Sequence, residues 1–573
     1  MAEIVVYRKR GFASLVMLLI GVALGVAGYL ITMLNQYGKL ADGWFVGPAI
    51  WAVVALVAWA VVRWRLPYAD PLLLPSVVAL NGIGMAMIYR LDQSSTPVMH
   101  SADLQLMWAI GSVATLCAVV FFLRDHRRLQ RFTYLWFIAG MVLLLMPLMP
   151  GLGAESHGAQ IWIRIGQFSF QPAEIAKIVL SIAFAAYLTE KRDVLALAGH
   201  RFVGIDLPRA RDLGPILIMW GTSLIVLVFE KDLGTALLFF GLFVMMLYVA
   251  TERPSWALLG FLMLIAMGVL GYAAFDHVRV RFESWLTPFD DYGRNLQVIN
   301  AQFGLASGGL FGTGWGQGRP YLTPLSKNDF ISAAIGEELG LVGLFAVILI
   351  FLVIVARVLR ASLASREPFG KLLAAGLAFV FALQVFVIIG GVTRLLPLTG
   401  LTTPFVSQGG SSLISNYLLL GLMLTITHQV RHPQVQVPTD EFATFTTDRT
   451  EQMATVGAVG AVASARAATA RDDANERLGA RPDPDALDAP TEFVSEASGA
   501  GVGASQTNAS ADAPTELVGG QPSGRPASES PWQPDASDAK PSAWASLNDD
   551  EPGEETQALD PLDVPVKDEE ADK

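Results

Sequence analysis

Residues 279–343 read RVRFESWLTPFDDYGRNLQVINAQFGLASGGLFGTGWGQGRPYLTPLSKNDFISAAIGEELGLVG. Within the first 430 residues, this is the only long segment that is neither apolar enough to cross a membrane nor short enough to be a plain connection. It holds seven glycines between Gly304 and Gly318, and it reaches Asp329 just before the next apolar run. Loops longer than about 12–15 residues are usually functional or disordered. Because apolar and aromatic residues occur throughout this loop, we expect it to be ordered and to carry function.

The composition around this loop is that of a membrane protein. Hydrophobic residues make up 53% of the 573 residues and charged residues 16%, and the mean hydropathy is +0.46, whereas soluble domains carry about 25% charged residues. The net charge of −11 combines two unlike parts. Residues 440–573 contain 28 acidic and nine basic residues, so their net charge is −19 and that of residues 1–439 is +8. A basic membrane portion suits an anionic lipid surface, and an acidic tail suits solvent.

A membrane span needs about 20 predominantly apolar residues. We predict an all-α polytopic membrane protein with twelve transmembrane helices, of which the third is the least regular because Asn81 and Gly82 interrupt it. The predicted spans lie near residues 12–34, 44–62, 71–89, 105–123, 132–149, 173–189, 212–229, 233–250, 256–275, 332–356, 372–393 and 411–428. The first run lacks a small-residue cleavage site, so we expect no cleaved signal peptide. The single cysteine, Cys117, excludes an intrachain disulfide and a cysteine metal cluster.

Lysine and arginine in the short connections predict the orientation in the membrane. Basic and basic-poor connections alternate, which places both termini in the cytoplasm and the long loop outside. The basic segments are residues 8–10, 63–65, 124–131, 191–211, 253 and 357–371. The long loop also carries cations, which we interpret as functional because long loops follow the charge rule weakly.

Three regions follow from this pattern. Residues 1–430 form a polytopic membrane domain, and residues 276–331 are its large extracellular loop. Residues 431–573 form an acidic, disordered, cytoplasmic tail, because they cannot bury enough apolar surface to offset chain entropy. Within the tail, the segments 488–494 and 512–518 differ only at Phe493 and Leu517. Such a repeat is either functional or a low-complexity duplication.

Ionisable groups at membrane depth cost about 2.5–3.5 kcal/mol each on insertion scales, so they are candidate functional residues. Glu174 and Lys177 open the sixth span at i and i+3, where they share a helix face and can form an ion pair, either structural or functional. The other places are the turn at 230–235, which can be a solvated turn, the glutamates of the tenth span, and residues 405–412. In the last of these, Ser411 or Ser412 can simply cap the helix that follows.

Common chemical motifs indicate little. Residues 312–318 alternate glycine with other residues, but no strand precedes them and no Gly-Lys-Ser/Thr follows, so a phosphate-binding loop is only weakly indicated. The sequence contains no His-Glu-x-x-His, Gly-x-Ser-x-Gly or Cys/His metal pattern.

Five motifs, by their order and spacing, resemble the SEDS family of peptidoglycan glycosyltransferases, which includes RodA and FtsW. They are Gln171-Pro-Ala-Glu174-x-x-Lys177, Asp232-Leu-Gly-Thr235, Gly308-Gly-Leu-Phe-Gly312-x-Gly314, Asn328-Asp329-Phe330-Ile331 with Gly336-Glu-Glu-Leu-Gly340, and residues 397–412. The resemblance covers roughly residues 70–430 and is greatest to the actinobacterial RodA branch. The chain departs from the family pattern at Asn328, at Gln408 and at Gln160, where the family often has threonine, tyrosine and a nearby arginine.

The resemblance implies that lipid II is polymerised into glycan strands outside the membrane. It implies Asp329 as the general base, for which the alternative is a helix N-cap carboxylate. Candidate substrate-binding residues are Lys177, Arg281 and Arg394 as a diphosphate clamp, Glu174 and Glu338, which would position Lys177 or line the cavity, and Ser407. No cofactor is assigned, although a divalent cation (Mg²⁺ or Mn²⁺) could assist at the diphosphate; no metal-ligand set is recognisable.

Two other functions stay open from the residues alone. Twelve spans with buried charges suit a lipid II flippase or transporter equally well, and a non-catalytic scaffold for a penicillin-binding protein is the third reading. A flippase needs polar groups through the full depth of the membrane, whereas chemistry on one side needs them at the outer face. The expected partners are lipid II, the bacterial cytoplasmic membrane and a single-pass class B penicillin-binding protein, with no nucleic acid.

The tail carries a separate prediction. Thr491 and Thr515 occupy the same position in the two repeats. A phosphate on each would add strong hydrogen-bond acceptors and negative charge. We expect regulatory phosphothreonines read by an arginine-bearing binding module; the alternative is a tail that only solubilises.

Overall fold

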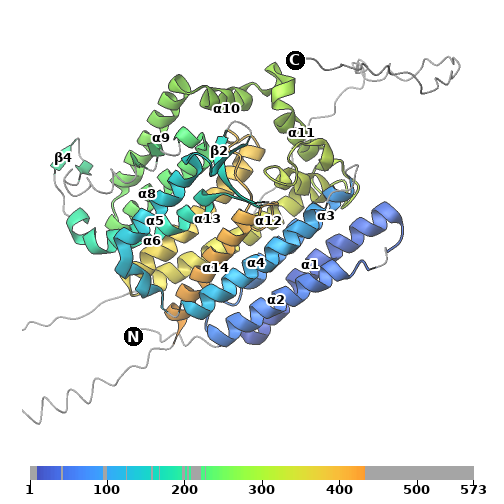
Figure 1. Ribbon diagram of the computed structural model, residues 1–573, viewed down its shortest axis with the longest axis horizontal. Coiled ribbons are helices and arrows are strands. Elements are labelled where there is room, and N and C mark those ends of the chain that lie inside the picture. The colour runs from blue at the N-terminus through green and yellow to red at the C-terminus, as the bar shows by residue number, and fades with distance from the viewer. Residues whose placement is uncertain are drawn as a thin grey trace, which may run out of the picture. The chain divides into compact units, whose positions relative to one another are not determined.

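Long helices make up most of the described part of the chain and run side by side (Figure 1). This computed structural model describes residues 9–432, apart from 41–42, 95–99, 124, 157–158, 167, 197–199, 203–204, 208–220, 223 and 226–227. The long helices are α1 (Gly11–Tyr37), α2 (Val46–Arg65), α3 (Leu73–Gln93), α4 (Ser101–Phe122), α5 (Thr133–Leu145), α6 (Pro172–Ala196), α8 (Leu233–Thr251), α9 (Pro254–Ala274), α12 (Ile331–Ala364), α13 (Pro368–Val392) and α14 (Gly410–Arg431). The 3-10 turns η1 (His126–Phe132) and η2 (Met146–Leu148) extend α5 at both ends.

Eleven helical segments among the described residues are long and apolar enough to cross a membrane. They coincide with eleven of the twelve predicted spans. The remaining predicted span, 212–229, lies largely outside the described residues. The predicted tail lies outside them beyond residue 432.

The interruption in the third predicted span is a feature of helix packing. A Cβ on Gly25 of α1 would lie 2.8 Å from the Cα of Gly82 in α3, so the two backbones meet at this pair. Small residues permit such close approach between membrane helices. The Asn81 amide donates to the carbonyl of Phe405 at 3.0 Å. Both residues that interrupt the apolar pattern therefore make contacts inside the bundle.

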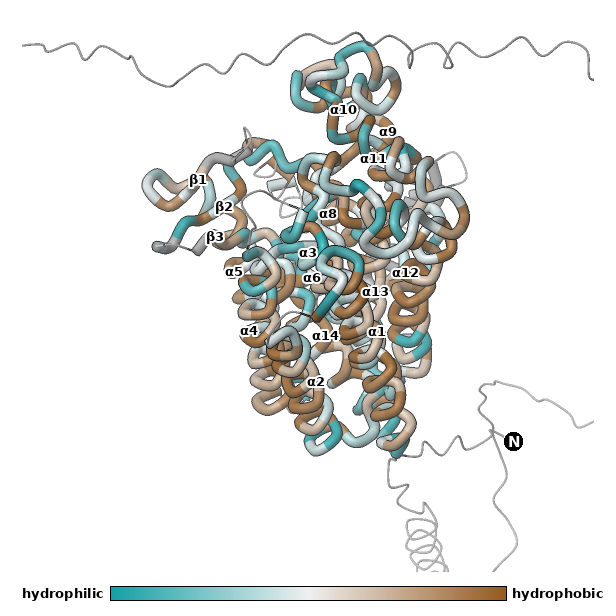
Figure 2. Tube along the Cα trace, turned by 90° about the vertical axis from the view of Figure 1, so that its right-hand side faces the viewer, coloured by the Kyte–Doolittle hydropathy of each residue, from teal (hydrophilic) through white to brown (hydrophobic). Residues whose placement is uncertain are grey.

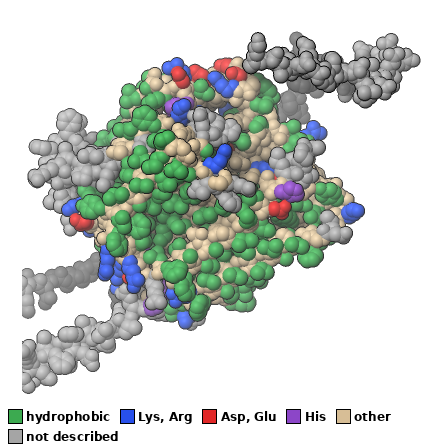
Figure 3. Space-filling view, viewed as in Figure 1, with side chains coloured by type: hydrophobic (Ala, Val, Ile, Leu, Met, Phe, Trp, Pro, Cys, Tyr) green, Lys and Arg blue, Asp and Glu red, His purple; other side chains and the backbone are tan. Residues whose placement is uncertain are grey.

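The most buried helices include the least apolar ones. The spans of α3, α6 and α14 are 83%, 89% and 83% buried with mean hydropathies of 1.3, 1.4 and 1.3, whereas α12 has a mean hydropathy of 3.2 and is 28% buried. This order is expected where lipid surrounds the bundle, because polar side chains must then find partners inside. Apolar side chains cover much of the outer face in Figure 3. The chain is therefore a multi-pass membrane protein.

The long loop is folded, as the sequence predicts. It contains α10 (Asp276–Leu286), η3 (Pro288–Asp290), α11 (Tyr292–Gly308) and η4 (Pro320–Leu322). A three-stranded antiparallel sheet lies at the same end of the bundle, in the order β1 (Gly153–Ser156), β2 (Ala159–Ile165) and β3 (Phe168–Phe170) (Figure 2). A second antiparallel pair, β4 (His200–Phe202) and β5 (Ile205–Leu207), follows α6. These short strands are additions to the predicted all-α architecture.

The glycine-rich part of the loop packs against a kink in α12. Gly340 has φ +68° and ψ −172° inside this helix, a conformation that suits glycine because it has no Cβ. A Cβ there would lie 2.2 Å from the amide nitrogen of Gly312, and the amide of Thr313 donates to the carbonyl of Glu337 at 3.0 Å. The glycines serve backbone packing, so the weak indication of a phosphate-binding loop is wrong.

The opposite end of the bundle is held by an ion-pair cluster. The fully buried Asp70, between α2 and α3, pairs with Arg357 of α12 at 2.7 Å and with Arg431 of α14. The Lys9 ammonium lies 5.6 Å from the ring of Tyr68, and the ring of His432 lies 5.1 Å from it, so both described chain ends meet two residues from Asp70. The two described chain ends therefore share one side of the bundle, and the long loop lies at the other.

Candidate active site

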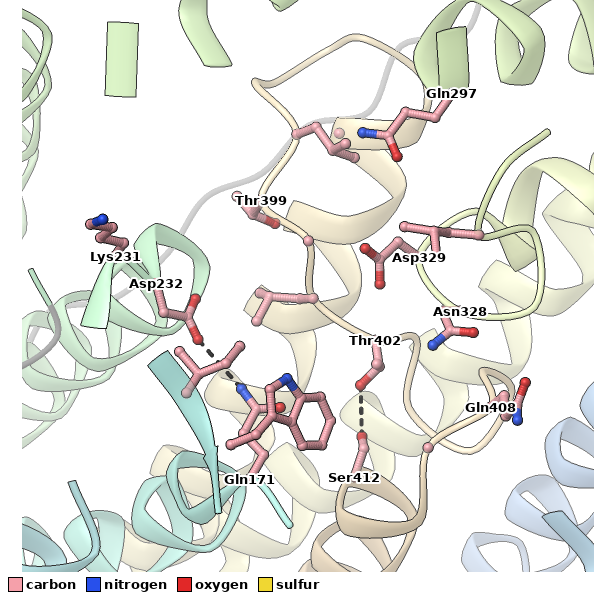
Figure 4. A pocket seen from close by; sticks show the side chains of 18 of the residues that line it. Gln171, Lys231, Asp232, Gln297, Asn328, Asp329, Thr399, Thr402, Gln408 and Ser412 are labelled. Atoms are coloured by element: carbon pink, nitrogen blue, oxygen red, sulfur yellow. Dashed lines mark hydrogen bonds between the residues drawn. The ribbon is translucent and has the colours of Figure 1, made fainter. Parts of the chain in front are cut away.

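A cavity of about 910 Å³ lies at the loop end of the bundle (Figure 4). Its wall is built from helix starts, connections and the strands β2 and β3. The charged side chains that line it are Arg164, Glu174, Lys231, Asp232, Arg281, Arg294, Asp329 and Arg394. The cations in this wall outnumber the carboxylates, which favours an anionic ligand.

Asp329 lies in this wall at the junction between the long loop and α12. The residue is half-buried, and Figure 4 shows its carboxylate directed toward the segment that carries Thr399. The N-cap position of α12 is Phe330, and no side chain caps the helix there. The alternative that Asp329 serves as a helix cap is therefore wrong, and its carboxylate is placed at the cavity.

Gly400 is the point at which Asp329 and Arg281 approach each other. A Cβ on Gly400 would lie 3.7 Å from Oδ2 of Asp329 and 3.9 Å from Nη1 of Arg281. The φ of Gly400 is +75°, which few other residues adopt without strain. Arg281 is fixed by donating from Nη1 to the carbonyl of Leu398 at 2.8 Å. The structure thus brings the predicted base and one predicted clamp residue to the same part of the wall.

Arg281 also interacts with a second carboxylate. Burial lowers the pKa of Arg281, while the negative charges of Asp232 and Asp329 act in the opposite direction. A guanidinium remains protonated in proteins. Arg281 is therefore a permanent cation between two acidic residues of the cavity wall.

Arg394 lines the same cavity from the end of α13. Its Nη2 donates to the carbonyl of Trp285 at 2.8 Å, and the Trp285 indole donates to the carbonyl of Arg394 at 2.9 Å. Its φ is +61°, which is uncommon for a residue other than glycine. Its buried Nε makes no hydrogen bond to the residues that the structure describes. A fixed cation with an unused donor suits an oxyanion ligand.

In the turn before α8, Glu230 and Asp232 are buried and Lys231 is exposed, so the interpretation of it as a solvated turn is wrong for its two carboxylates. Asp232 caps α8: its carboxylate accepts from the amide of Thr235 at 3.0 Å and from the hydroxyl at 2.6 Å. The side-chain amide of Gln171 donates to the same carboxylate at 3.4 Å (dashed in Figure 4). Burial raises the pKa of Asp232, and its bonds to Thr235 lower it.

Glu230, two residues earlier, is fully buried, and within the described part of the chain neither of its carboxylate oxygens makes a hydrogen bond. Burial first, and then the charge of Asp232, raise the pKa of Glu230 to about 8 from an ordinary 4.5. Between these values the folded protein holds a proton that the unfolded chain has released. The free energy of unfolding therefore falls as the pH rises through this range.

We expect Glu230→Gln to remove this pH dependence, because glutamine resembles the protonated carboxyl group and does not ionise. The variant should be more stable than the wild type by on the order of 3 kcal/mol near pH 8, and no more stable than it well below pH 4.5. Thermal unfolding in detergent across this range measures the difference, with the exposed Glu252→Gln as a control. A difference that does not change with pH would contradict a buried, protonated Glu230.

Glu174 and Lys177 form the predicted ion pair, at 2.5 Å. Glu174 lines the cavity, but Lys177 does not. The Lys177 ammonium is buried one turn further into α6 and also donates to Gln384 of α13 at 2.9 Å. Of the three predicted clamp residues, Arg281 and Arg394 line the cavity, and Lys177 lies behind its wall, paired with Glu174.

Two other predicted substrate-binding residues lie behind the cavity wall. Glu338 is buried, pairs with Arg90 at 3.1 Å and accepts from the amide of Gly316 at 2.8 Å. Ser407 is also buried, and its hydroxyl donates to the carbonyl of Asn328 at 2.6 Å. Neither residue lines the cavity. Both residues hold loop backbone in place, and their contact with substrate stays a prediction.

The serines at the start of α14 do not cap it. The N-cap position is Gly409, without a side-chain bond. The Ser411 hydroxyl instead accepts from the amide of Gln171 at 3.1 Å, and the Thr402 hydroxyl donates to Ser412 at 2.9 Å (Figure 4). Both serines line the cavity.

Several cavity residues escaped the sequence reasoning. Gln171, Asp232 and Asn328 stand inside the quoted motifs, so their motifs were the available signal. Trp162 and Trp285 line the cavity without any local pattern that distinguishes them from structural aromatics. The predicted regulatory residues Thr491 and Thr515 lie outside the described residues.

The fold and the site define a multi-pass membrane protein with a cationic cavity at one end of its bundle and an aspartate in the cavity wall. The profile of the FtsW, RodA and SpoVE proteins, described as "Cell cycle protein", matches residues 71–432. The chain belongs to this family, which confirms the resemblance seen in its motifs.

Individual relatives agree with this assignment. The peptidoglycan glycosyltransferase RodA of Mycobacterium tuberculosis is 45% identical over 431 residues, which cover 74% of this chain and 92% of that protein. The probable peptidoglycan glycosyltransferase FtsW of Geobacter metallireducens is 32% identical over 374 residues, covering 63% of this chain and 95% of that protein. A solved structure described as "Structural coordination of polymerization and crosslinking by a peptidoglycan synthase complex" is 25% identical, with a TM-score of 0.51, and covers 64% of this chain and 99% of that chain.

Proposed function

We propose that this chain polymerises lipid II into glycan strands at the outer face of the bacterial cytoplasmic membrane, in cell elongation, with Asp329 as the general base. The chain is a peptidoglycan glycosyltransferase, because relatives that bear this name match most of its length at 45% identity. The observation that supports the role of Asp329 is its place in the cavity wall beside Gly400, where its charge acts on Arg281.

The proposed reaction joins two sugars that are already activated. The acceptor hydroxyl attacks the anomeric carbon of the donor sugar, and the bond from that carbon to the diphosphate oxygen breaks. Asp329 takes the hydroxyl proton, a role that typically contributes about 10²–10⁴-fold to the rate. Arg281 and Arg394 stabilise the charge on the departing diphosphate. No general acid is required, because the diphosphate leaves as a stable anion.

The placement of the polar groups favours this reaction over transport. The cavity is lined by residues of the strands, the long loop, and the helix ends on one side of the bundle. A flippase would need polar groups through the full depth of the membrane. The described lining residues provide them at one end, where a membrane-bound donor and a growing strand can meet.

The orientation is part of the proposal: both termini face the cytoplasm and the cavity faces outward. The basic residues near Asp70 lie at the end opposite the cavity, as the charge rule requires of a cytoplasmic end. Single-cysteine variants labelled with an impermeant thiol reagent test it. Exposed Tyr321 in the loop should be labelled in intact cells and exposed Arg366 should not, after each is replaced by cysteine. The reverse pattern would reject this orientation.

The activity is tested by reconstituting the purified full chain in liposomes with labelled lipid II. We expect glycan strands on a denaturing gel, without any added polymerase. Movement of lipid II across the bilayer without polymer would support the flippase, and neither activity would support the scaffold. Each of these outcomes would reject the proposed function.

A divalent cation, if one takes part, would be bound to the donor diphosphate of the substrate. Among the described residues, no group of three or more His, Cys, Asp or Glu side chains is placed to hold a metal ion. We therefore derive no step through a metal held by the protein. A Mg²⁺ or Mn²⁺ ion bound to the donor diphosphate would neutralise part of its charge. An unchanged polymerisation rate in excess chelator would reject this part of the proposal.

The proposed partner is a single-pass class B penicillin-binding protein, which would cross-link the new strands. One solved relative is described as a peptidoglycan synthase complex that coordinates polymerization and crosslinking. Co-purification in mild detergent, together with the effect of partner deletion on polymerisation, tests the pairing. Failure of both would reject it.

The tail proposal concerns Thr491 and Thr515. Two phosphorylated copies, about two dozen residues apart, could engage a two-site reader at a raised effective concentration. Phosphopeptide mapping of protein from growing cells tests this, with Thr491→Ala/Thr515→Ala cells scored for shape. Unmodified threonines under growth and stress, or variant cells of normal shape, would leave the tail as a solubilising segment.

A further inference from the structure

The last turn of α3 holds the segment that carries Asp329. The carboxylate of Asp92 places Oδ1 2.5 Å from the ammonium of Lys327, and its Oδ2 accepts from the amide of Ala102 at 2.7 Å. The Lys327 ammonium also reaches the Ser101 hydroxyl at 3.3 Å. Asp92 is 1% exposed, and the Lys327 side chain is 13% exposed. This buried ion pair joins α3, the start of α4 and the long loop.

The backbone beside Asp329 is held from the other side by the segment before α14. The amide of Gln408 donates to the carbonyl of Lys327 at 2.9 Å. The hydroxyl of Ser407 donates to the carbonyl of Asn328 at 2.6 Å. Both carbonyls that precede Asp329 are therefore bonded, while the Lys327 side chain is fixed on α3.

We propose that Lys327, fixed by Asp92, is a positioning residue that sets the place of the Asp329 carboxylate in the cavity. The proposal rests on the proposed role of Asp329 as the base. Lys327 does not line the cavity, whereas Asn328 and Asp329 do. It therefore acts through the backbone and not by contact with substrate. A displacement of about 1 Å at a reacting group can lower a rate by about 100-fold, so the loss of this anchor should be seen in turnover.

The test compares three variants of the full chain in steady-state polymerisation of lipid II. Lys327→Met keeps the length of the side chain without its charge, and Lys327→Arg keeps the charge. The double variant Asp92→Asn/Lys327→Met leaves no unpaired carboxylate in the interior, and the asparagine oxygen can still accept from Ala102. Lys371→Met is the matched control. The Lys371 ammonium lies 3.6 Å from the carboxylate of Glu252, and neither residue lines the cavity.

We expect kcat to fall about 10- to 100-fold in Lys327→Met and in the double variant, while KM for lipid II stays within about threefold. Lys327→Arg should keep at least about a third of the wild-type kcat, and Lys371→Met should match the wild type. These outcomes together support positioning. A defect in substrate binding would instead change KM, and a defect in folding would lower the folded fraction, which unfolding curves measure.

Four results would overturn the proposal. A double variant with the wild-type rate would trace the loss in Lys327→Met to the unpaired carboxylate. A raised KM at constant kcat would place Lys327 in substrate binding. Full kcat in every Lys327 variant, beside an inactive Asp329→Asn, would reject positioning and leave the base assignment standing. An Asp329→Asn variant with the wild-type rate would reject the base assignment itself, and positioning with it.

Discussion

Asp329→Asn is expected to lower polymerisation of lipid II by about 10²–10⁴-fold. The amide keeps the size of the carboxylate but cannot take the proton from the acceptor hydroxyl. Asp329 is half-buried in the cavity wall and does not cap α12, so the substitution should leave the fold intact. Single-turnover rates of strand formation, with wild-type and variant protein at equal lipid II, measure the effect.

The matched control is Asp290→Asn. Asp290 is an exposed carboxylate in the same long loop, and it does not line the cavity. It should polymerise lipid II at the wild-type rate. If Asp329→Asn retained more than about a tenth of the wild-type rate, its role as the base would be untenable.

Lys177→Met is expected to destabilise the protein by about 3–5 kcal/mol, since breaking a buried ion pair leaves one charge without a partner. Lys177 and Glu174 are 3% and 6% exposed, and their charged atoms are 2.5 Å apart. The same ammonium donates to Gln384, whose amide in turn donates to the carbonyl of Thr402 at 3.0 Å. Polymerisation should fall with stability, because Thr402 and Glu174 both belong to the cavity wall. Unfolding curves in detergent measure the first effect.

The double variant Glu174→Gln/Lys177→Met tests whether Lys177 stabilises the cavity wall or contacts the substrate. It removes both charges, and neutral replacement of a buried pair is often close to neutral for stability. We expect stability to return, and polymerisation to return to within about tenfold of the wild type. If stability were restored and polymerisation stayed as low as in the single variant, Lys177 would be a residue that binds the diphosphate.

Local patterns accounted for much of the architecture. A span is recognised from about 20 apolar residues, whatever its neighbours are, and eleven predicted spans coincide with helices in the described residues. The pairing of Glu174 with Lys177 follows from helical spacing alone. The folded state of the long loop was also predictable, because aromatic and aliphatic residues recur along it.

The positions of Glu338 and Ser407 behind the cavity wall depend on partners distant in sequence. Glu338 meets Arg90, 248 residues away, and Ser407 meets the carbonyl of Asn328, 79 residues away. Both side chains are of types that bind substrates, so nothing local distinguishes a ligand from a loop anchor. The charged residues of the turn at 230–235 suggested a solvated turn, but Glu230 and Asp232 are buried within the bundle.

The sequence by itself determined that this chain is a multi-pass membrane protein of the FtsW, RodA and SpoVE family with a folded loop ending at Asp329. Apolar run length, helical spacing and motif order are properties of neighbouring residues, so they can be read along the chain. The tertiary structure decided which charges share the cavity. Arg281, Asp329 and Gly400 come from three separate segments that meet only when the helices pack, and the same packing withdraws Lys177 and Glu338 into ion pairs behind the wall.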